Sequence, residues 1–129
     1  MKRPTVLLLS VLLAFAAGLA VGRAAGQGKP RMWADVVLDV TSDQIPRRTH
    51  VHANLDHWEP GAETGKHTHP GPTVFVMLDG EVEETLADGK TRTIKAGQAF
   101  WKPPRHEHNV KNVSDRPARA LAVHLDPAR

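Results

Sequence analysis

From Met32 onward, the chain consists of short apolar or alternating runs that are interrupted every few residues by Gly, Pro, Asp or Asn. No stretch of useful length repeats apolar residues at the period of a helix, and alternation between turn residues is typical of strands. We therefore expect an all-β domain of eight short strands, arranged as a sandwich or barrel. The expected strands cover residues 34–40, 49–58, 73–78, 81–86, 91–94, 99–101, 108–112 and 118–125.

Two Asp-Gly pairs predict hairpins, because both residues can take the positive φ angles of a tight turn. The first is Asp79-Gly80 and the second is Asp88-Gly89. The strand at 73–78 is apolar at both parities, so both of its faces should be covered. Either residues 34–40 or a second copy of the chain would cover the outer face, and a homodimer is one expected assembly.

The N-terminus has the layout of a secretory signal peptide. Lys2 and Arg3 precede an apolar run from Val6 to Val21, and small residues follow it. The run is shorter than the ~20 residues that span a bilayer, which favours a removed signal over an uncleaved anchor. We therefore expect a periplasmic or secreted protein, with no stable membrane insertion after cleavage.

The signal is assigned to residues 1–25, a flexible lead-in to 26–31 and the folded domain to 32–129. The chain has no cysteine, which excludes disulfides, thiolate ligands and cysteine nucleophiles. Three of its 17 basic residues lie in the leader, and the other 14 balance the 14 acidic residues. A neutral domain with scattered basic residues and few aromatics is not expected to bind nucleic acid.

Histidines and glycines recur at regular spacings in two segments. The first reads Gly61-AETGK-His67-Thr-His69-PGP-Thr73-VFVMLD-Gly80. The second reads Gly97-QAFWK-Pro103-Pro-Arg105-HE-His108-NVK-Asn112. A His-x-His pair alone is weak evidence for a metal site, but the frame around it adds weight.

These segments resemble the two motifs of the cupin superfamily, G-x5-H-x-H-x3-E-x6-G and G-x5-P-x-G-x2-H-x3-N. The resemblance implies a cupin-type jelly-roll β-barrel. It also implies that His67, His69 and His108 bind one divalent metal ion, and that the motif glycines and Asn112 are turn and packing residues.

Two motif positions differ from the family pattern. Thr73 replaces the usual glutamate, and a threonine hydroxyl is a poor metal ligand, so three imidazoles and water would form the inner shell. Thr73 shares the parity of His67 and His69 and should still face the site. Arg105 replaces a glycine, which indicates a mildly strained turn or a different loop shape, with the cation at the pocket rim.

Several other side chains could join the site. His106 could be a fourth ligand, although a peripheral role is favoured. One of His50 and His52 could line the cavity as a proton carrier, and His124 could contact a ligand. Glu63 and Glu107 are the nearest substitutes for the missing glutamate, and Phe75, Met77 and Trp101 are expected to line the barrel.

Three-histidine cupin sites without the glutamate resemble those of certain thiol and diketone dioxygenases, which use ferrous iron. The resemblance therefore favours iron and a dioxygenase-like oxidoreductase acting on a small organic molecule, although Zn, Mn, Ni or Cu would suit the same ligands. A non-catalytic periplasmic protein that binds a metal or small ligand is the alternative. A cupin isomerase or lyase, with a histidine as general base, is a further alternative.

Overall fold

The computed structural model describes residues 30–129. The signal peptide predicted at 1–25 and most of the lead-in lie outside the described residues. Contacts divide the chain after Ala34, and the unit from Asp35 to Arg129 contains every strand of the described residues. The strands are β1 Thr49–Trp58, β2 Thr73–Asp79, β3 Glu81–Leu86, β4 Thr91–Lys95, β5 Ala99–Lys102, β6 His108–Lys111 and β7 Ala118–Pro127. In the part of the chain that is described, no helix is long and apolar enough to cross a membrane.

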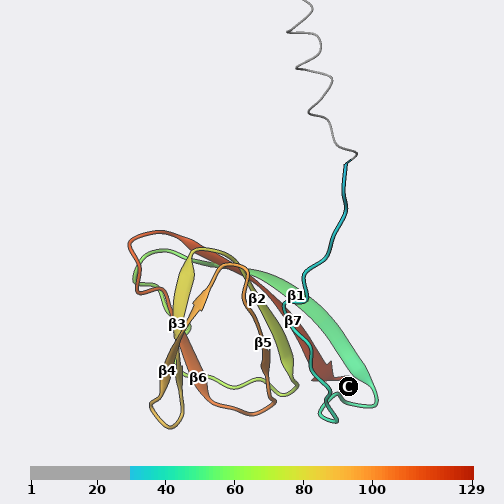
Figure 1. Ribbon diagram of the computed structural model, residues 1–129. Coiled ribbons are helices and arrows are strands. Elements are labelled where there is room, and N and C mark those ends of the chain that lie inside the picture. Colours follow the sequence, from blue (N-terminus) through green and yellow to red (C-terminus); the bar gives the residue numbers. More distant parts are fainter. Residues whose placement is uncertain (1–29) are drawn as a thin grey trace, which may run out of the picture. The chain divides into compact units, whose positions relative to one another are not determined.

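The seven strands form two antiparallel sheets, which Figure 1 shows facing each other. One sheet has the order β1-β7-β2-β5 and the other has the order β4-β3-β6. The all-β prediction is confirmed, and seven of the eight expected strands are present within one or two residues of their expected ends.

One of the two predicted hairpins is confirmed and the other is wrong. Asp88-Gly89 joins β3 to β4, which pair directly. Asp79-Gly80 does not join two paired strands, because β2 pairs with β5 and β7 while β3 lies in the other sheet. Gly80 instead carries the chain across from one sheet to the other, with a φ of 72°. An Asp-Gly pair therefore predicts the tight turn here but not the pairing of the strands that flank it.

The strand expected at residues 34–40 is absent, and this prediction is wrong. The segment has no regular secondary structure, and Val36 and Val37 are 83% and 54% exposed. An alternating run becomes a strand only when a neighbouring edge satisfies its backbone groups. Nor does the segment bury the outer face of β2, where Val74 and Val76 are half-buried and Leu78 is exposed.

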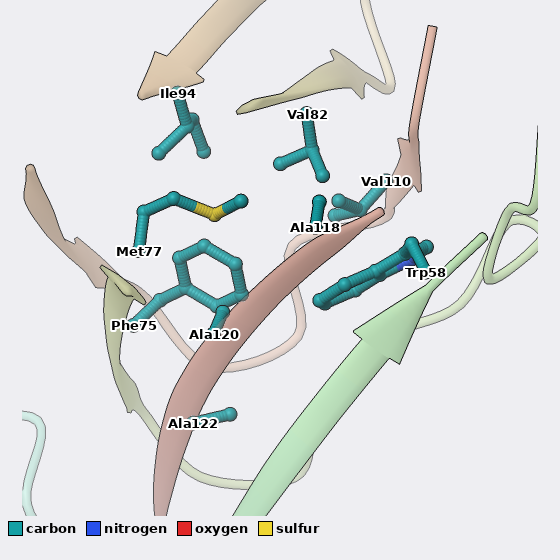
Figure 2. Close-up of a cluster of buried hydrophobic side chains, with 9 residues drawn as sticks. All are labelled: Trp58, Phe75, Met77, Val82, Ile94, Val110, Ala118, Ala120 and Ala122. Carbon is teal, nitrogen blue, oxygen red and sulfur yellow. The ribbon is translucent and has the colours of Figure 1, made fainter. Parts of the chain in front are cut away.

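The core lies between the sheets, and Figure 2 shows side chains from both of them converging on it. It consists of nine buried apolar residues, namely Trp58, Phe75, Met77, Val82, Ile94, Val110, Ala118, Ala120 and Ala122. This packing confirms Phe75 and Met77 as inward residues. The prediction that Trp101 lines the barrel is wrong. Its side chain faces outward from β5 and donates a hydrogen bond from Nε1 to Gln44 Oε1 at 3.0 Å.

Several strands change from apolar to polar along their inward faces. On β7, three buried alanines are followed at the same parity by His124, and on β6 Val110 shares its parity with His108. On β1, the buried Trp58 shares its parity with Asp56 and Asn54, which line a cavity. One part of the interior is thus closed by apolar packing, and the remainder is an open polar chamber.

Candidate metal centre

Backbone pairing brings the two histidine segments together. His67 and His69 lie in the loop between β1 and β2, while His108 begins β6. His67 and His108 exchange two backbone hydrogen bonds of 3.0 Å each. The Arg105 amide donates to the His69 carbonyl at 2.8 Å. These contacts hold the loop against β6, so the imidazoles converge even though only His108 lies on a regular strand.

The side-chain nitrogens of His67, His69 and His108 lie within 4.8 Å of one another, and these three residues could hold a metal ion. The Nδ1 of His67 donates to the Gly65 carbonyl at 2.9 Å, and that of His108 donates to the His106 carbonyl at 3.0 Å. A neutral imidazole that donates through Nδ1 has a lone pair at Nε2. His67 Nε2 lies 3.1 Å from His69 Nε2, so the unprotonated nitrogen of His67 faces the His69 ring, and these nitrogens could bind one metal ion.

Burial favours the neutral form of His69 and His108. The pKa of His69 is lowered to about 4. Desolvation is the largest cause, and repulsion from the nearby His124, His67 and His108 adds to it. Desolvation also lowers the pKa of His108 and of His124. Neutral imidazole is the form that binds a metal ion.

We expect the metal-free protein to lose stability as the pH falls from about 6.5 to about 4. In this window the unfolded chain protonates its histidines while the buried His69 remains neutral, so protons favour unfolding. Thermal unfolding at pH 7, 5.5 and 4.5 of protein from which a chelator has removed the metal measures the effect. A His69→Gln variant has no titrating group there and should show a shallower dependence. A melting temperature that is constant over this range would contradict the expectation.

The three histidines open onto a cavity of about 470 Å³ between the sheets. Its lining combines polar and apolar side chains. The lining residues are His52, Asn54, Asp56, His57, Trp58, Ala62, Glu63, Thr64, His67, His69, Thr73, Phe75, Lys102, His108, Val110, Ala122, His124 and Asp126. A chamber of this size admits a small organic molecule next to the histidines.

Thr73 lies where its parity predicts, buried on the inward face of β2 and lining the cavity. Its Oγ1 lies 3.0 Å from Nδ1 of His124 on β7. The Nε2 of the same His124 ring lies 3.4 Å from Nδ2 of Asn54 on β1. The position that holds glutamate in the family motif thus belongs to a hydrogen-bonded chain across three strands.

A row of imidazoles leads away from the three candidate ligands. The ring centroids of His69 and His124 are 4.7 Å apart, those of His124 and His52 are 4.6 Å apart, and those of His52 and His50 are 5.4 Å apart. His52 and His124 line the cavity, as considered from the sequence, whereas His50 does not. His52 Nδ1 is buried without a hydrogen-bond partner and lies 3.9 Å from Asp126 Oδ2.

Arg105, His106 and Glu107 do not line this cavity. Their side chains border a separate surface hollow next to residues 86–88. Arg105 has a φ of 61°, which agrees with the strained turn expected where the motif has glycine. The contributions of Arg105 and His106 to the site are made by backbone groups, the amide that donates to His69 and the carbonyl that accepts from His108.

Of the two carboxylates considered as substitutes for the motif glutamate, only Glu63 lines the cavity. Its Oε2 accepts a hydrogen bond of 2.6 Å from Asn109 Nδ2, and it is not part of the three-residue cluster. The motif turn residues behave as the resemblance implies. Gly61 and Gly97 have φ angles of 82° and 85°, and the buried Asn112 donates to the Arg116 carbonyl at 2.6 Å.

The sequence reasoning missed Asp56 and Lys102, two of the charged residues that line the cavity. Asp56 on β1 is half-buried, and burial raises the pKa of its carboxyl group. Lys102 on β5 is 6% exposed, and its Nζ lies 2.7 Å from Oε1 of the buried Glu84. The available signal was their position in the strands, since Asp56 shares its parity with the buried Trp58 and Lys102 shares its parity with Phe100.

The Lys102–Glu84 pair is embedded in a wider network. Arg92 Nε donates to Glu84 Oε2 at 2.6 Å, and Lys102 Nζ lies 4.3 Å from the centre of the Phe75 ring. Burial alone would raise the pKa of Glu84, but Lys102 and Arg92 outweigh it and hold this pKa below its ordinary value. Burial lowers the pKa of Lys102 even though Glu84 opposes the change.

Comparison with known proteins places this architecture in a family. Residues 54–124, more than half of the chain, match the cupin domain model. The polyketide synthase CurC of Streptomyces cyaneus is 36% identical over 53% of this chain and 44% of its own length. The β-alanine degradation protein BauB of Pseudomonas aeruginosa is 44% identical over 43% of this chain and 60% of its own length. The chain thus spans about half the length of these curated relatives.

Among solved structures, Bacillus subtilis oxalate decarboxylase, described with Mn(II) centres, superposes with a TM-score of 0.53. It is 29% identical, and the superposition covers 64% of this chain and 23% of that one. The two histidine motifs, the two-sheet fold and the domain match agree, and this chain is a member of the cupin family.

Proposed function

We propose that this protein is a metal-dependent enzyme, a dioxygenase-like oxidoreductase that acts on a small organic molecule. The main observation behind this proposal is that three imidazoles converge, with side-chain nitrogens within 4.8 Å of one another, beside a cavity of about 470 Å³. The cluster that could hold the ion contains no carboxylate among residues 30–129. Three neutral ligands leave coordination positions for water or substrate.

Iron is the favoured metal, and Zn, Mn, Ni or Cu would suit the same three nitrogens. A divalent ion held there would supply Lewis-acid or redox chemistry at its open positions. The Mn(II) centres of the oxalate decarboxylase support a metal role for this fold. This chain's own residues orient the imidazoles of His67 and His108 through the Gly65 and His106 carbonyls, and the apolar core separates one side of the site from water.

The substrate that we propose is a small organic molecule. The cavity combines the apolar surfaces of Trp58, Phe75 and Val110 with polar groups, which suits a molecule that has both kinds of surface. The names of the two curated relatives refer to polyketide synthesis and β-alanine degradation, and both concern small organic molecules. We also propose export to the periplasm or medium, because Lys2 and Arg3 followed by the apolar run from Val6 to Val21 have the layout of a signal peptide.

The test uses protein purified from its native compartment. Elemental analysis identifies the metal, and oxygen uptake is then followed with a panel of thiols, diketones, phenols and sugars. Stoichiometric iron together with oxygen uptake on one substrate class would support the proposal. A metal-loaded protein that neither consumes oxygen nor changes any compound would overturn the oxidoreductase assignment and favour the non-catalytic binding protein.

The cavity also supports a second candidate, an isomerase or lyase. That chemistry needs a general base in the cavity, and His52, His124 and Asp56 all line it. Within residues 30–129 no hydrogen bond or ion pair holds the Asp56 carboxylate, which leaves it free to meet a substrate. Conversion of a panel compound without oxygen consumption would favour this candidate over the oxidoreductase.

We expect the protein to form a homodimer through the outer face of the four-stranded sheet. Val51 and Leu55 on β1 are 58% and 50% exposed, and the residues that pair with them on β7, Leu125 and Leu121, are only half-buried. An apolar face on adjacent strands is characteristic of an interface. Sedimentation equilibrium should give twice the mass of the chain, and a Val51→Glu, Leu55→Glu double variant should sediment as a monomer. A monomeric wild type would contradict the expectation.

A further inference from the structure

Thr73 requires an explanation, because a threonine hydroxyl cannot replace the glutamate ligand of the family motif. Its side chain is 1% exposed and lines the cavity beside the three histidines. A valine would fill nearly the same volume without burying a polar group. The hydroxyl must therefore be satisfied within the interior, and its partners indicate what it does.

The direction of the hydrogen bonds around His124 follows from the Asn54 amide. Asn54 Nδ2 can only donate, and it lies 3.4 Å from His124 Nε2, so this nitrogen accepts. A neutral imidazole that accepts at Nε2 carries its proton on Nδ1. His124 Nδ1 therefore donates to Thr73 Oγ1, which lies 3.0 Å away. The hydrogen bonds therefore all donate in one direction, from Asn54 on β1 to His124 on β7 and from His124 to Thr73 on β2.

The Thr73 hydroxyl still has its own proton to donate. Among the described residues, its hydrogen-bond partner is the His124 nitrogen, and that contact uses the oxygen as acceptor. A buried hydroxyl proton without an acceptor is unfavourable, so an acceptor is expected in the space that Thr73 faces. That space is the cavity next to His69, whose ring centroid is 4.7 Å from that of His124.

We propose that the Asn54–His124–Thr73 chain makes Thr73 a hydrogen-bond donor to the ligand that binds beside the three histidines. The ligand then presents an acceptor oxygen at this point, as a carboxylate or a carbonyl group does. The direction of this hydrogen-bonded chain follows from the orientation of the Asn54 amide, whereas the place of the ligand rests on the proposed metal site. Thr73 binds the ligand, and Asn54 and His124 are positioning residues.

The first test measures the tautomer of His124 in the metal-free wild-type protein. Long-range proton–nitrogen NMR correlations distinguish a protonated from an unprotonated ring nitrogen. We expect a protonated Nδ1 and an unprotonated Nε2, which is the less common form of free histidine. A proton on Nε2 would reverse the chain, make Thr73 a donor to His124, and overturn the proposal. This test needs neither metal nor substrate.

The second test measures formate binding to the cobalt-loaded protein, through the visible absorption of Co(II). Thr73→Val keeps the shape and removes the hydroxyl, and we expect it to weaken formate binding about tenfold. Thr73→Ser keeps the hydroxyl and should bind within about threefold of the wild type. Equal affinity of the valine variant, or no formate binding by loaded wild type, would overturn the proposed donor role.

The two tests separate the proposal from the function on which it partly rests. Metal content and thermal unfolding are measured for every variant, so a folding defect is not mistaken for a lost hydrogen bond. If the wild type takes up no metal, the proposed metalloenzyme fails. The NMR result still decides the direction of the Asn54–His124–Thr73 chain in that case.

Discussion

Replacing both His67 and His69 with alanine is expected to lower metal affinity by more than about a hundredfold, because loss of a residue that merely orients a ligand already costs 10–100-fold. The two rings supply two of the three converging nitrogens. A single imidazole from His108 would remain, and one such ligand does not retain a divalent ion against buffer. Elemental analysis after extensive dialysis measures the loss.

His106→Ala is the matched control for this experiment. It removes a histidine that is two residues from His108 but whose side chain lies outside the cavity. Its backbone carbonyl, which accepts from His108, remains in place. The control should keep a full complement of metal. Equal metal content in the double variant and the wild type would show that the three histidines do not form the site.

Replacing Glu84 with glutamine is expected to reduce the free energy of unfolding by about 3–5 kcal/mol, because it leaves a buried cation without its partner. Glu84 and Lys102 are 1% and 6% exposed, and their charged atoms are 2.7 Å apart. Water cannot solvate the Lys102 ammonium in the way it would on a surface. Urea unfolding at pH 7, monitored by circular dichroism, measures the change.

A Glu84→Met, Lys102→Met double variant separates the unpaired charge from the loss of packing. Removing both charges should cost less than removing Glu84 alone, because a buried pair often contributes little net stability over apolar residues. Asp88 and Lys90 provide an exposed comparison, with a charged-atom distance of 2.8 Å at the β3–β4 turn. Asp88→Asn should leave stability nearly unchanged. A double variant that is less stable than Glu84→Gln would contradict this account.

Much of the fold could be predicted from local pattern. Alternation identified seven strands, and Asp88-Gly89 identified the β3–β4 hairpin, because these features depend on residues close together in the chain. The spacing of the two motifs selected His67, His69 and His108, which the structure brings within 4.8 Å. Motif spacing predicts the ligands because the glycines and prolines of the motifs set the turns of the backbone, and the number of residues between them sets where each histidine lies.

Other features required the complete fold. Residues 34–40 alternate as a strand does, but no sheet edge in the described part of the chain pairs with them. Asp79-Gly80 makes a turn, yet the strands on either side of it pair in different sheets. Whether a strand pairs, and with which other strand, depends on segments that are distant in the sequence. The local residue pattern therefore does not identify the pairing partner.

The sequence by itself determined an all-β cupin domain with three candidate ligands. Only the tertiary structure showed which other side chains line the cavity and how they are hydrogen-bonded. Asn54, Thr73 and His124 come from three strands, and their hydrogen-bonded chain exists only because β1, β7 and β2 lie side by side. Register likewise turned Lys102 inward and Trp101 outward. The physical reason is that hydrogen bonds and burial act between neighbours in space, and sheet pairing makes neighbours of residues far apart in sequence.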